Sequence, residues 1–243
     1  LFTTSQESLE NAQVAKYASM IDQMGVKPGD HVLEIGCGWG GFSSYVAKIY
    51  KCKIDAITIS KEQYDYTASK IQKEGLGEKV AVLFKDYREI NNKYSNIASI
   101  EMFEAVGKKY WHSYFDTIKN SLSENGKAAL QIITINEKRA NDYQARPDFI
   151  QQYIFPGGML PTKNQLEVSA KDVGLKCLEV LSFGKSYAKT LNIWNSQFQD
   201  SWKDVSNIGF DIQFKRMWEY YFAYCETGFL SSSTDVSHFI VEK

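Results

Sequence analysis

The chain has 243 residues, with 28 basic and 29 acidic side chains and a formal net charge of −1. This length suits one α/β domain with a full hydrophobic core, so we expect residues 1–243 to form a single domain. The balanced charge gives no field that would gather nucleic-acid phosphates, and nucleic acid is not an expected partner. The four cysteines are scattered without a CxxC pair, which predicts neither a metal site nor a disulfide framework.

Apolar stretches are short along the whole sequence, and none reaches the roughly 20 residues that cross a bilayer. No positively charged leader precedes an apolar segment. Together with the scattered cysteines, this predicts a cytoplasmic protein. The chain opens at Leu1 without a methionine, so we expect its natural beginning to lie upstream.

The predicted elements begin with a helix over 8–24, which the turn at 28–30 separates from the first strand. Short β-rich runs then alternate with helical ones. The predicted strands are 31–36, 53–60, 80–86, 97–103 and 128–135, and the helices between them are 41–50, 61–74 and 110–122. This alternation predicts βαβ units and a mostly parallel sheet with helices on both faces.

The later part of the chain predicts a strand over 177–183, helices over 187–202 and 210–224, and a final strand over 238–241. The segment 136–162 breaks the alternation. We interpret it as an insertion over the carboxyl end of the sheet, where open α/β sheets bind ligands.

Residues 34–41 read EIGCGWGG, a strand end followed by glycines at alternate positions and then a helix. Glycines let the backbone turn sharply and approach a ligand without a clashing Cβ atom. The G-x-G-x-G spacing resembles the first motif of class I methyltransferases, whose loop passes under the amino-acid portion of S-adenosylmethionine (SAM). A turn that only packs a helix on a strand is the alternative. The implied SAM contacts are Glu34, Gly36, Cys37, Gly38, Trp39 and Gly40.

Two later strand ends strengthen the SAM interpretation. Thr58, Ser60 and Gln63 follow the second predicted strand, where the ribose should lie. Asp86 and Tyr87 end the third strand, where the carboxylate or its adjacent backbone N–H can bond the adenine edge and the tyrosine can pack on it. Such residues are also common helix caps, so their order along the chain is what favours the cofactor site.

The motifs together resemble the cyclopropane fatty acid synthase and mycolic acid methyltransferase family of SAM-dependent enzymes. The stretches that carry the resemblance are 34–41 (EIGCGWGG), 60–63 (SKEQ), 86–88 (DYR), 101–107 (EMFEAVG), 153–161 (YIFPGGMLP), 187–191 (YAKTL) and 225–229 (CETGF). The resemblance implies a class I methyltransferase (Rossmann-like) fold, with a seven-stranded, mostly parallel sheet and a helical insertion over the active site.

In that family the alkene of an unsaturated acyl chain attacks the sulfonium methyl group, and a proton must then leave the resulting carbocation. Members hold a bicarbonate ion as the base. Carried over by position, the resemblance implies Glu104 and Tyr187 as catalytic residues, with Gln131 where the family has a histidine. Bicarbonate is therefore an expected cofactor beside SAM. From the residues alone, Glu104 also suits a helix-capping carboxylate, and Tyr187 an ordinary half-buried tyrosine.

Gln131 is the departure from the family pattern, because its amide can donate to an anion but cannot carry a positive charge or titrate as histidine does. The fate of the cation stays open. Proton loss at the ring position gives a cyclopropane, which we favour, and loss elsewhere or after a hydride shift gives a methylene or methyl branch.

The implied substrate is an acyl chain on a membrane phospholipid or an acyl carrier. The balanced charge favours brief contact with the inner face of the membrane over stable anchoring. Of the many late aromatic residues, Tyr153 and Phe155 are the best candidates for the acyl tunnel. A monomer and a homodimer both suit this size. The rival functions are a small-molecule N- or O-methyltransferase and an inactive SAM-binding module.

Overall fold

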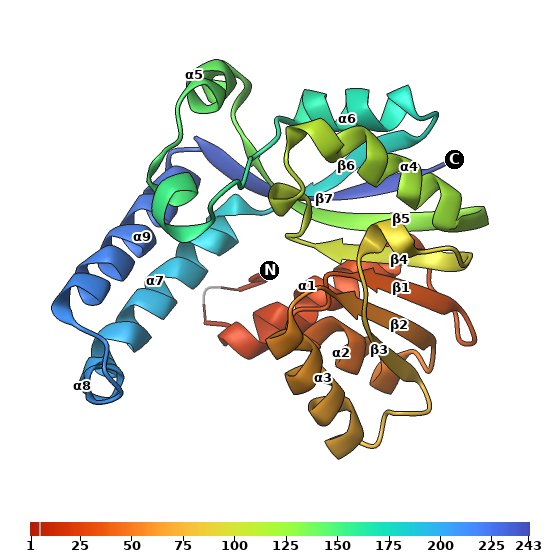
Figure 1. The fold of residues 1–243 in the computed structure, drawn as a ribbon, viewed down its shortest axis with the longest axis horizontal. Coiled ribbons are helices and arrows are strands. Elements are labelled where there is room, and N and C mark those ends of the chain that lie inside the picture. Colours follow the sequence, from red (N-terminus) through yellow and green to blue (C-terminus); the bar gives the residue numbers. More distant parts are fainter. Residues whose placement is uncertain (5) are drawn as a thin grey trace.

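The computed structural model describes residues 1–4 and 6–243, which form a sheet flanked by helices, with a helical pair projecting to one side (Figure 1). In this part of the chain the sheet has seven strands in the order β3-β2-β1-β4-β5-β7-β6. Their bounds are β1 His31–Ile35, β2 Lys53–Thr58, β3 Val80–Phe84, β4 Tyr94–Ile100, β5 Leu122–Ile135, β6 Lys176–Ser182 and β7 Thr234–Glu242. The first five strands pair in parallel, and β7 runs antiparallel to β5 and β6. The predicted seven-stranded, mostly parallel sheet is confirmed.

Helices cover both faces of the sheet because each presents one apolar stripe to it. One apolar core joins the strands to α1 (Leu9–Met24), α2 (Gly41–Ile49) and α3 (Lys61–Lys73). A second core, on the other face, joins them to α4 (Trp111–Ser121) and α6 (Lys163–Asp172). The remaining long helices, α7 (Gly184–Asp200) and α9 (Ile212–Leu230), pack mainly on each other through a third, smaller cluster, with the short α8 (Trp202–Asn207) between them.

The order in which successive strands are added to the sheet reverses at β1. From there β2 and β3 extend to one side, while β4 and β5 extend to the other. The carboxyl ends of β1 and β4 therefore flank the topological switch point, where open α/β sheets bind ligands.

Several predicted boundaries were wrong. The fourth strand ends at Ile100 rather than continuing to 103, because Glu101 adopts a left-handed backbone with φ 52°. The helix α6 was missed, although Thr162 and Gln165 form a capping box at its start. The segment 136–162 contains the short helices η4 (Glu137–Arg139), α5 (Ala140–Ala145) and the π-helical turn η5 (Ile150–Ile154).

Candidate active site

The glycine turn after β1 requires its glycines. Gly36, Gly38 and Gly40 have φ values of 80°, 52° and 71°, in the left-handed region that other residues rarely adopt. A Cβ atom on Gly40 would lie 2.7 Å from Thr67 Cγ2 in α3. The turn is tied to β2, because the backbone N–H groups of Gly36 and Cys37 donate to the Ile57 carbonyl at 3.0 and 2.9 Å. The turn is thus held in one shape by its neighbours.

Helix α3 braces the outer side of the same turn. The Thr67 hydroxyl donates to the Gly38 carbonyl at 3.0 Å, and Lys70 Nζ donates to the carbonyls of Trp39 and Gly40 at 3.4 Å each. The Trp39 ring is 56 % exposed and meets Tyr66 edge to face. Cys37 is buried. An exposed tryptophan beside a braced turn leaves an apolar surface free for a ligand.

Glu34 lies beneath the glycine turn and is 2 % exposed. Its carboxyl group accepts from the Ser43 hydroxyl in α2. Burial raises the pKa of Glu34 to about 8, although the Ser43 contact and nearby lysines oppose this. The side chain therefore links β1 to the start of α2, and its direct contact with SAM stays a prediction.

The expected ribose-binding residues lie together at the end of β2. Thr58 Oγ1 donates to Gln63 Oε1 at 2.8 Å and accepts from the Ser60 backbone N–H at 3.1 Å. Ser60 caps α3 by accepting from the Gln63 N–H at 3.3 Å. The cap and the binding interpretation are compatible, because the same residues turn the chain at the carboxyl edge of the sheet.

Asp86 and Tyr87 follow β3, as expected. Both carboxylate oxygens of Asp86 accept from the Arg88 side chain, at 2.9 and 2.6 Å. That contact with Arg88 lowers the pKa of Asp86. The Tyr87 ring packs edge to face on Tyr114. The two expected adenine contacts are the Asp86 carboxylate and the adjacent backbone N–H. Only a contact through the N–H would leave the Asp86–Arg88 ion pair intact.

Gln131 and Tyr187, two of the three predicted catalytic residues, meet at a third residue that we had not assigned to the site. Gln131 Nε2 donates to Glu101 Oε1 at 2.6 Å and to the Tyr187 hydroxyl at 2.6 Å. The Tyr187 hydroxyl also donates to Glu101 Oε1. Burial and the neighbouring Glu101 raise the pKa of Tyr187, so its hydroxyl stays protonated and can donate.

Glu104 lies beside this cluster with a different partner. Its Oε1 accepts from the Ile133 backbone N–H at 2.6 Å, and its Oε2 is buried without a partner among the described residues. Burial, and then the charge of Glu101, raises the pKa of Glu104 to about 8. At neutral pH Glu104 is therefore mainly a neutral carboxylic acid.

His238 is a second residue that the sequence reasoning missed. It lies on β7 directly opposite Gln131, and its Nε2 is 3.2 Å from Gln131 Oε1. Burial lowers the pKa of His238 to about 3, so the ring is neutral and Nε2–H can donate to the amide oxygen. This contact turns the Gln131 nitrogen toward Glu101. The register between β5 and β7 creates the pair, and only the strand contents are visible in the sequence.

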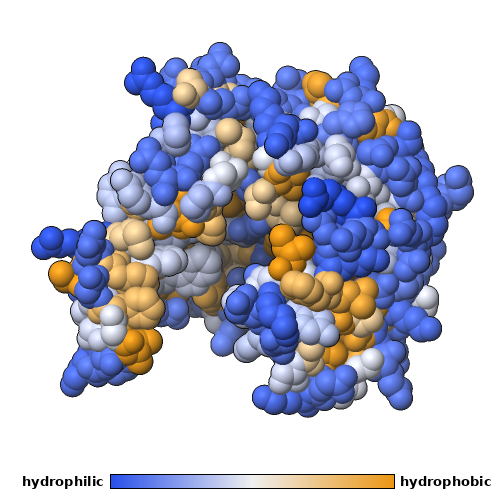
Figure 2. Space-filling model, in the orientation of Figure 1, coloured by the Kyte–Doolittle hydropathy of each residue, from blue (hydrophilic) through white to orange (hydrophobic). Residues whose placement is uncertain are grey.

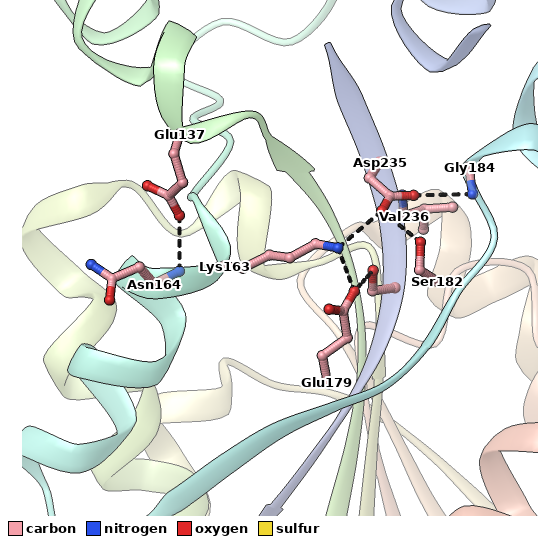
Figure 3. Close-up of polar contacts among 9 residues, drawn as sticks. Glu137, Lys163, Asn164, Glu179, Ser182, Gly184, Asp235 and Val236 are labelled. Atoms are coloured by element: carbon pink, nitrogen blue, oxygen red, sulfur yellow. Dashed lines mark hydrogen bonds and ion pairs between the residues drawn. The ribbon is translucent and has the colours of Figure 1, made fainter. Parts of the chain in front are cut away.

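The start of α7 is anchored to β7 by Asp235, which fixes the position of Tyr187 three residues later (Figure 3). Asp235 accepts from the Gly184 N–H at 3.1 Å, from the Ser182 hydroxyl at 2.6 Å and from Lys163 Nζ at 3.0 Å. A Cβ atom on Gly184 would lie 2.7 Å from Asp235 Oδ1, so this close approach requires glycine.

Two cavities border this region. The larger, about 540 Å³, lies at the Lys163–Asp235 cluster and contains none of the predicted site residues. The smaller, about 290 Å³, is enclosed by α1, α7 and α9 and is lined by Glu101 and Tyr187. Its remaining walls are mainly apolar: Leu1, Leu9, Ile100, Leu191, Trp194, Tyr221 and Phe229. A hollow between the α7–α9 pair and the rest of the molecule is visible in Figure 2. The smaller cavity, which we call the chamber, reaches the carboxyl end of β4 beside the switch point of the sheet.

Lys16 of α1 also lines this cavity and is only 7 % exposed. Desolvation lowers its pKa, while the charges of Glu101 and Glu34 oppose the shift. The amino group of Lys16 therefore lies within electrostatic range of both Glu34 and Glu101.

The segment 136–162 contacts Glu104 and α9. The Met159 N–H donates to the Glu104 carbonyl at 2.8 Å, and Phe149 packs on Tyr220 with ring centroids 4.6 Å apart. Tyr153 and Phe155, our tunnel candidates, are 64 % and 59 % exposed and do not line the chamber. The aromatic wall of this cavity comes from α7 and α9, and a role of Tyr153 and Phe155 in an acyl tunnel stays a prediction.

Known proteins match nearly the whole length of this chain. The family model "Mycolic acid cyclopropane synthetase" matches residues 1–239. Tuberculostearic acid methyltransferase UfaA1 of Mycobacterium tuberculosis is 36 % identical over 96 % of this chain and 55 % of its own length. Cyclopropane-fatty-acyl-phospholipid synthase of Escherichia coli is 35 % identical over 92 % of this chain and 56 % of its own length. The chain thus spans about half the length of these curated relatives.

Solved structures agree with the fold. The cyclopropane synthase MmaA2 from Mycobacterium tuberculosis superimposes with a TM-score of 0.91 at 25 % identity, covering 100 % of this chain and 88 % of MmaA2. The class I methyltransferase fold is confirmed. The motifs of the glycine turn, the strand order and the family match agree, and the chain belongs to the mycolic acid cyclopropane synthetase family.

Proposed function

We propose that this chain is a SAM-dependent enzyme that adds the SAM methyl carbon to the double bond of an unsaturated acyl chain, giving a cyclopropane. The observation that carries the proposal is the apolar chamber that opens at Glu101 and Tyr187, next to the strand end that bears the glycine turn. Donor and acceptor would meet there, at the switch point of the sheet.

The residues at the strand ends fit SAM. Three positive-φ glycines follow β1, a Thr–Ser–Gln cluster follows β2 and the Asp86–Tyr87 pair follows β3, all at one edge of adjacent parallel strands. A Cβ atom on Gly38 would meet nothing within 4 Å, so the turn borders open space. When bound, SAM supplies an electrophilic methyl group, and the protein's part is to orient it toward the chamber.

The chamber fits an acyl chain. Leu191, Trp194 and Phe229 offer apolar surface, and aromatic faces stabilise a nearby cation. Exclusion of water by such walls protects a carbocation from hydration. Most of the lining residues are apolar, although Gln13, Lys16 and Thr190 also line the chamber, and this balance favours an acyl chain over a small polar amine or alcohol.

The names of the relatives support alkylation of a fatty acid, and they are compatible with two classes of product. One is named a cyclopropane synthase and another a tuberculostearic acid methyltransferase. A methylene- or methyl-branched chain is therefore the alternative product. Both routes share methyl transfer to the alkene and differ in which proton leaves.

Bicarbonate does not fit the donors expected to hold it. The Gln131 amide and the Tyr187 hydroxyl both donate to Glu101, and the Ile133 N–H donates to Glu104. Three candidate donors for an anion are thus occupied by protein carboxyl groups. We derive no step through bicarbonate.

We place the substrate on a phospholipid at the inner face of the membrane. None of the helices in residues 1–4 and 6–243 is long and apolar enough to span a bilayer. The turn from α8 to α9 exposes Ile208, Phe210 and Ile212, by 76 %, 43 % and 58 %. Such a tip suits brief insertion among lipid headgroups. We propose that 136–162 and α7–α9 together enclose the acyl chain.

The test is incubation of the purified protein with trideuteromethyl-SAM and vesicles of an unsaturated phospholipid. We expect the acyl chain to gain one carbon carrying two deuterium atoms. Ozone then separates the products, since it cleaves a methylene branch and spares a ring. If labelled carbon enters a soluble amine and no unsaturated lipid, the proposal fails in favour of a small-molecule methyltransferase.

A further inference from the structure

Glu101 occupies the place that a bound anion would take between Gln131 and Tyr187. Its Oε1 accepts from both donors, at 2.6 Å from Gln131 Nε2 and in a short contact with the Tyr187 hydroxyl. Both Gln131 amide protons are used, one on Glu101 and one on the Tyr187 oxygen. A second anion would find no free donor from these residues and would be repelled by Glu101.

The backbone of Glu101 supports a special role for this side chain. Its φ of 52° is unusual for a residue other than glycine, and such strain persists where the surroundings enforce it. The Glu101 N–H donates to the Gln131 carbonyl at 2.9 Å. That bend directs the carboxylate from the end of β4 into the chamber that Glu101 lines.

Glu104 is less well placed than Glu101 to take a proton from a substrate in the chamber. It is buried, its Oε1 is used by Ile133, and its pKa of about 8 leaves it mainly protonated at neutral pH. It also does not line the chamber. Two nearby carboxyl groups in different environments divide the acid and base roles, and here Glu101 is the exposed, chamber-facing member.

We propose that Glu101 is the base that removes the proton from the cationic intermediate, in place of a bicarbonate ion. This inference rests on the proposed function. The alkene carbon bonds to the methyl carbon as the C–S bond of SAM breaks, which leaves S-adenosylhomocysteine, and a C–H bond of the transferred methyl group then breaks. Its electron pair closes the third C–C bond of the ring, and the proton passes to Glu101 Oε2, which forms no hydrogen bond with the described residues. The carboxylic acid then releases the proton to water through the chamber mouth.

The remaining residues of the cluster position that base. Tyr187 and Gln131 hold Oε1 and leave the second oxygen for the proton. His238 acts through Gln131, since its contact with the amide oxygen fixes which way the amide faces. The four side chains thus form one chain of hydrogen bonds from β7 to the chamber.

The experiment compares the wild type with Glu101→Gly in buffer purged of carbon dioxide, then with added bicarbonate or formate. Glycine accepts the left-handed backbone, so this variant is expected to fold. We expect wild-type turnover to be insensitive to purging. Turnover of Glu101→Gly should fall on the order of 10²–10⁴-fold. Added bicarbonate or formate should restore it on the order of tenfold, because the freed donors of Gln131 and Tyr187 can then hold a small anion.

Two matched controls separate chemistry from folding. Asn125→Gly relieves a φ of 59° at an exposed position of β5 and should change neither turnover nor rescue. Calorimetric titration should show unchanged SAM affinity for Glu101→Gly. Wild-type turnover that collapses on purging and returns with bicarbonate would overturn the inference, as would full turnover of purged Glu101→Gly. Absence of any alkylated lipid from the wild type would instead defeat the proposed function.

Discussion

The two sides of the switch point are built in different ways. On the β1–β2–β3 side, the ligand-binding features are local: a glycine turn, a serine cap and an aspartate cap each lie within a few residues of a strand end. On the β4–β5–β7 side, the cluster joins Glu101, Gln131, Tyr187 and His238, which are 30 to 107 residues apart where they contact. We call the β1–β2–β3 side the donor side, because it would hold the methyl donor SAM, and the β4–β5–β7 side the reaction side. Backbone conformation defines the donor side, and long-range side-chain contacts define the reaction side.

This difference separates binding from chemistry. Changes on the donor side should alter stability and SAM affinity, because the turn is braced by backbone contacts. Changes on the reaction side should alter turnover while SAM affinity persists. The two sides share one property, since each holds a buried carboxyl group, Glu34 or Glu104, whose pKa rises to about 8.

The largest expected effect on the donor side comes from Gly40→Ala. Its Cβ atom would be 2.7 Å from Thr67 Cγ2, on a backbone with φ 71°. We expect a loss of about 2–5 kcal/mol in the free energy of unfolding, from left-handed strain and overpacking. Chemical denaturation measures this loss, and SAM affinity should weaken with it.

Thr67→Ser provides the matched control for that change. Serine removes the clashing methyl group and keeps the hydroxyl that bonds the Gly38 carbonyl. The double variant should regain the overpacking part, about 1–3 kcal/mol. If it is no more stable than Gly40→Ala, the clash with α3 is not what excludes a side chain at this position.

The next effect is a change in how stability depends on pH in Glu104→Gln. The folded protein raises the pKa of Glu104 from 4.5 to about 8, so it binds that proton more tightly than the unfolded chain. The stability contributed by this group is therefore fully present below pH 4.5 and is lost as pH rises through about 8. We expect wild-type stability to fall by on the order of 2–4 kcal/mol per buried carboxyl group across that window.

Glu104→Gln should remove about half of that slope, since Glu34 contributes the rest. Because glutamine resembles the protonated acid, turnover should stay within about tenfold of the wild type. Denaturation curves at a series of pH values measure the slope, with Glu78→Gln as a surface control. An unchanged slope would show that Glu104 is ionised in the folded protein.

The smallest effect is expected from His238→Phe, which sharpens the contrast between positioning and binding. Phenylalanine keeps the ring contact with Phe183 and cannot donate to Gln131 Oε1. We expect kcat to fall about tenfold, because the activation free energy should rise by about the free energy of one hydrogen bond. Stability should change little, because His238 Nδ1 is already buried without a partner among the described residues.

A structural role alone would give a different result for that variant. His112→Phe, at an exposed position of α4, should leave kcat unchanged. If His238→Phe lowers stability and SAM affinity together while kcat per folded molecule is constant, His238 only fills the core.

The local structure of the donor side could be predicted from the sequence, because glycine spacing and caps are local signals, while its contacts with SAM stay a prediction. The seven strands and their mostly parallel pairing also followed from the alternation of elements. Glu101 was overlooked because the strand was extended past it to 103, and no local pattern reveals a left-handed glutamate. His238 was overlooked because a cross-strand pair depends on register, which the sequence of either strand alone does not contain.

Residues 1–100 contain β1, β2 and β3, which the glycine turn, the Thr58–Gln63 cluster and the Asp86–Tyr87 pair follow. The strand that carries His238, by contrast, is the last of the described strands in chain order, yet it lies between β5 and β6. During synthesis the half that carries the glycine turn can therefore assemble while the ribosome is still producing the remainder, but the half that carries the Glu101 cluster cannot close until β7 emerges. The Glu101 cluster is in this sense the last part of the molecule to be completed in folding.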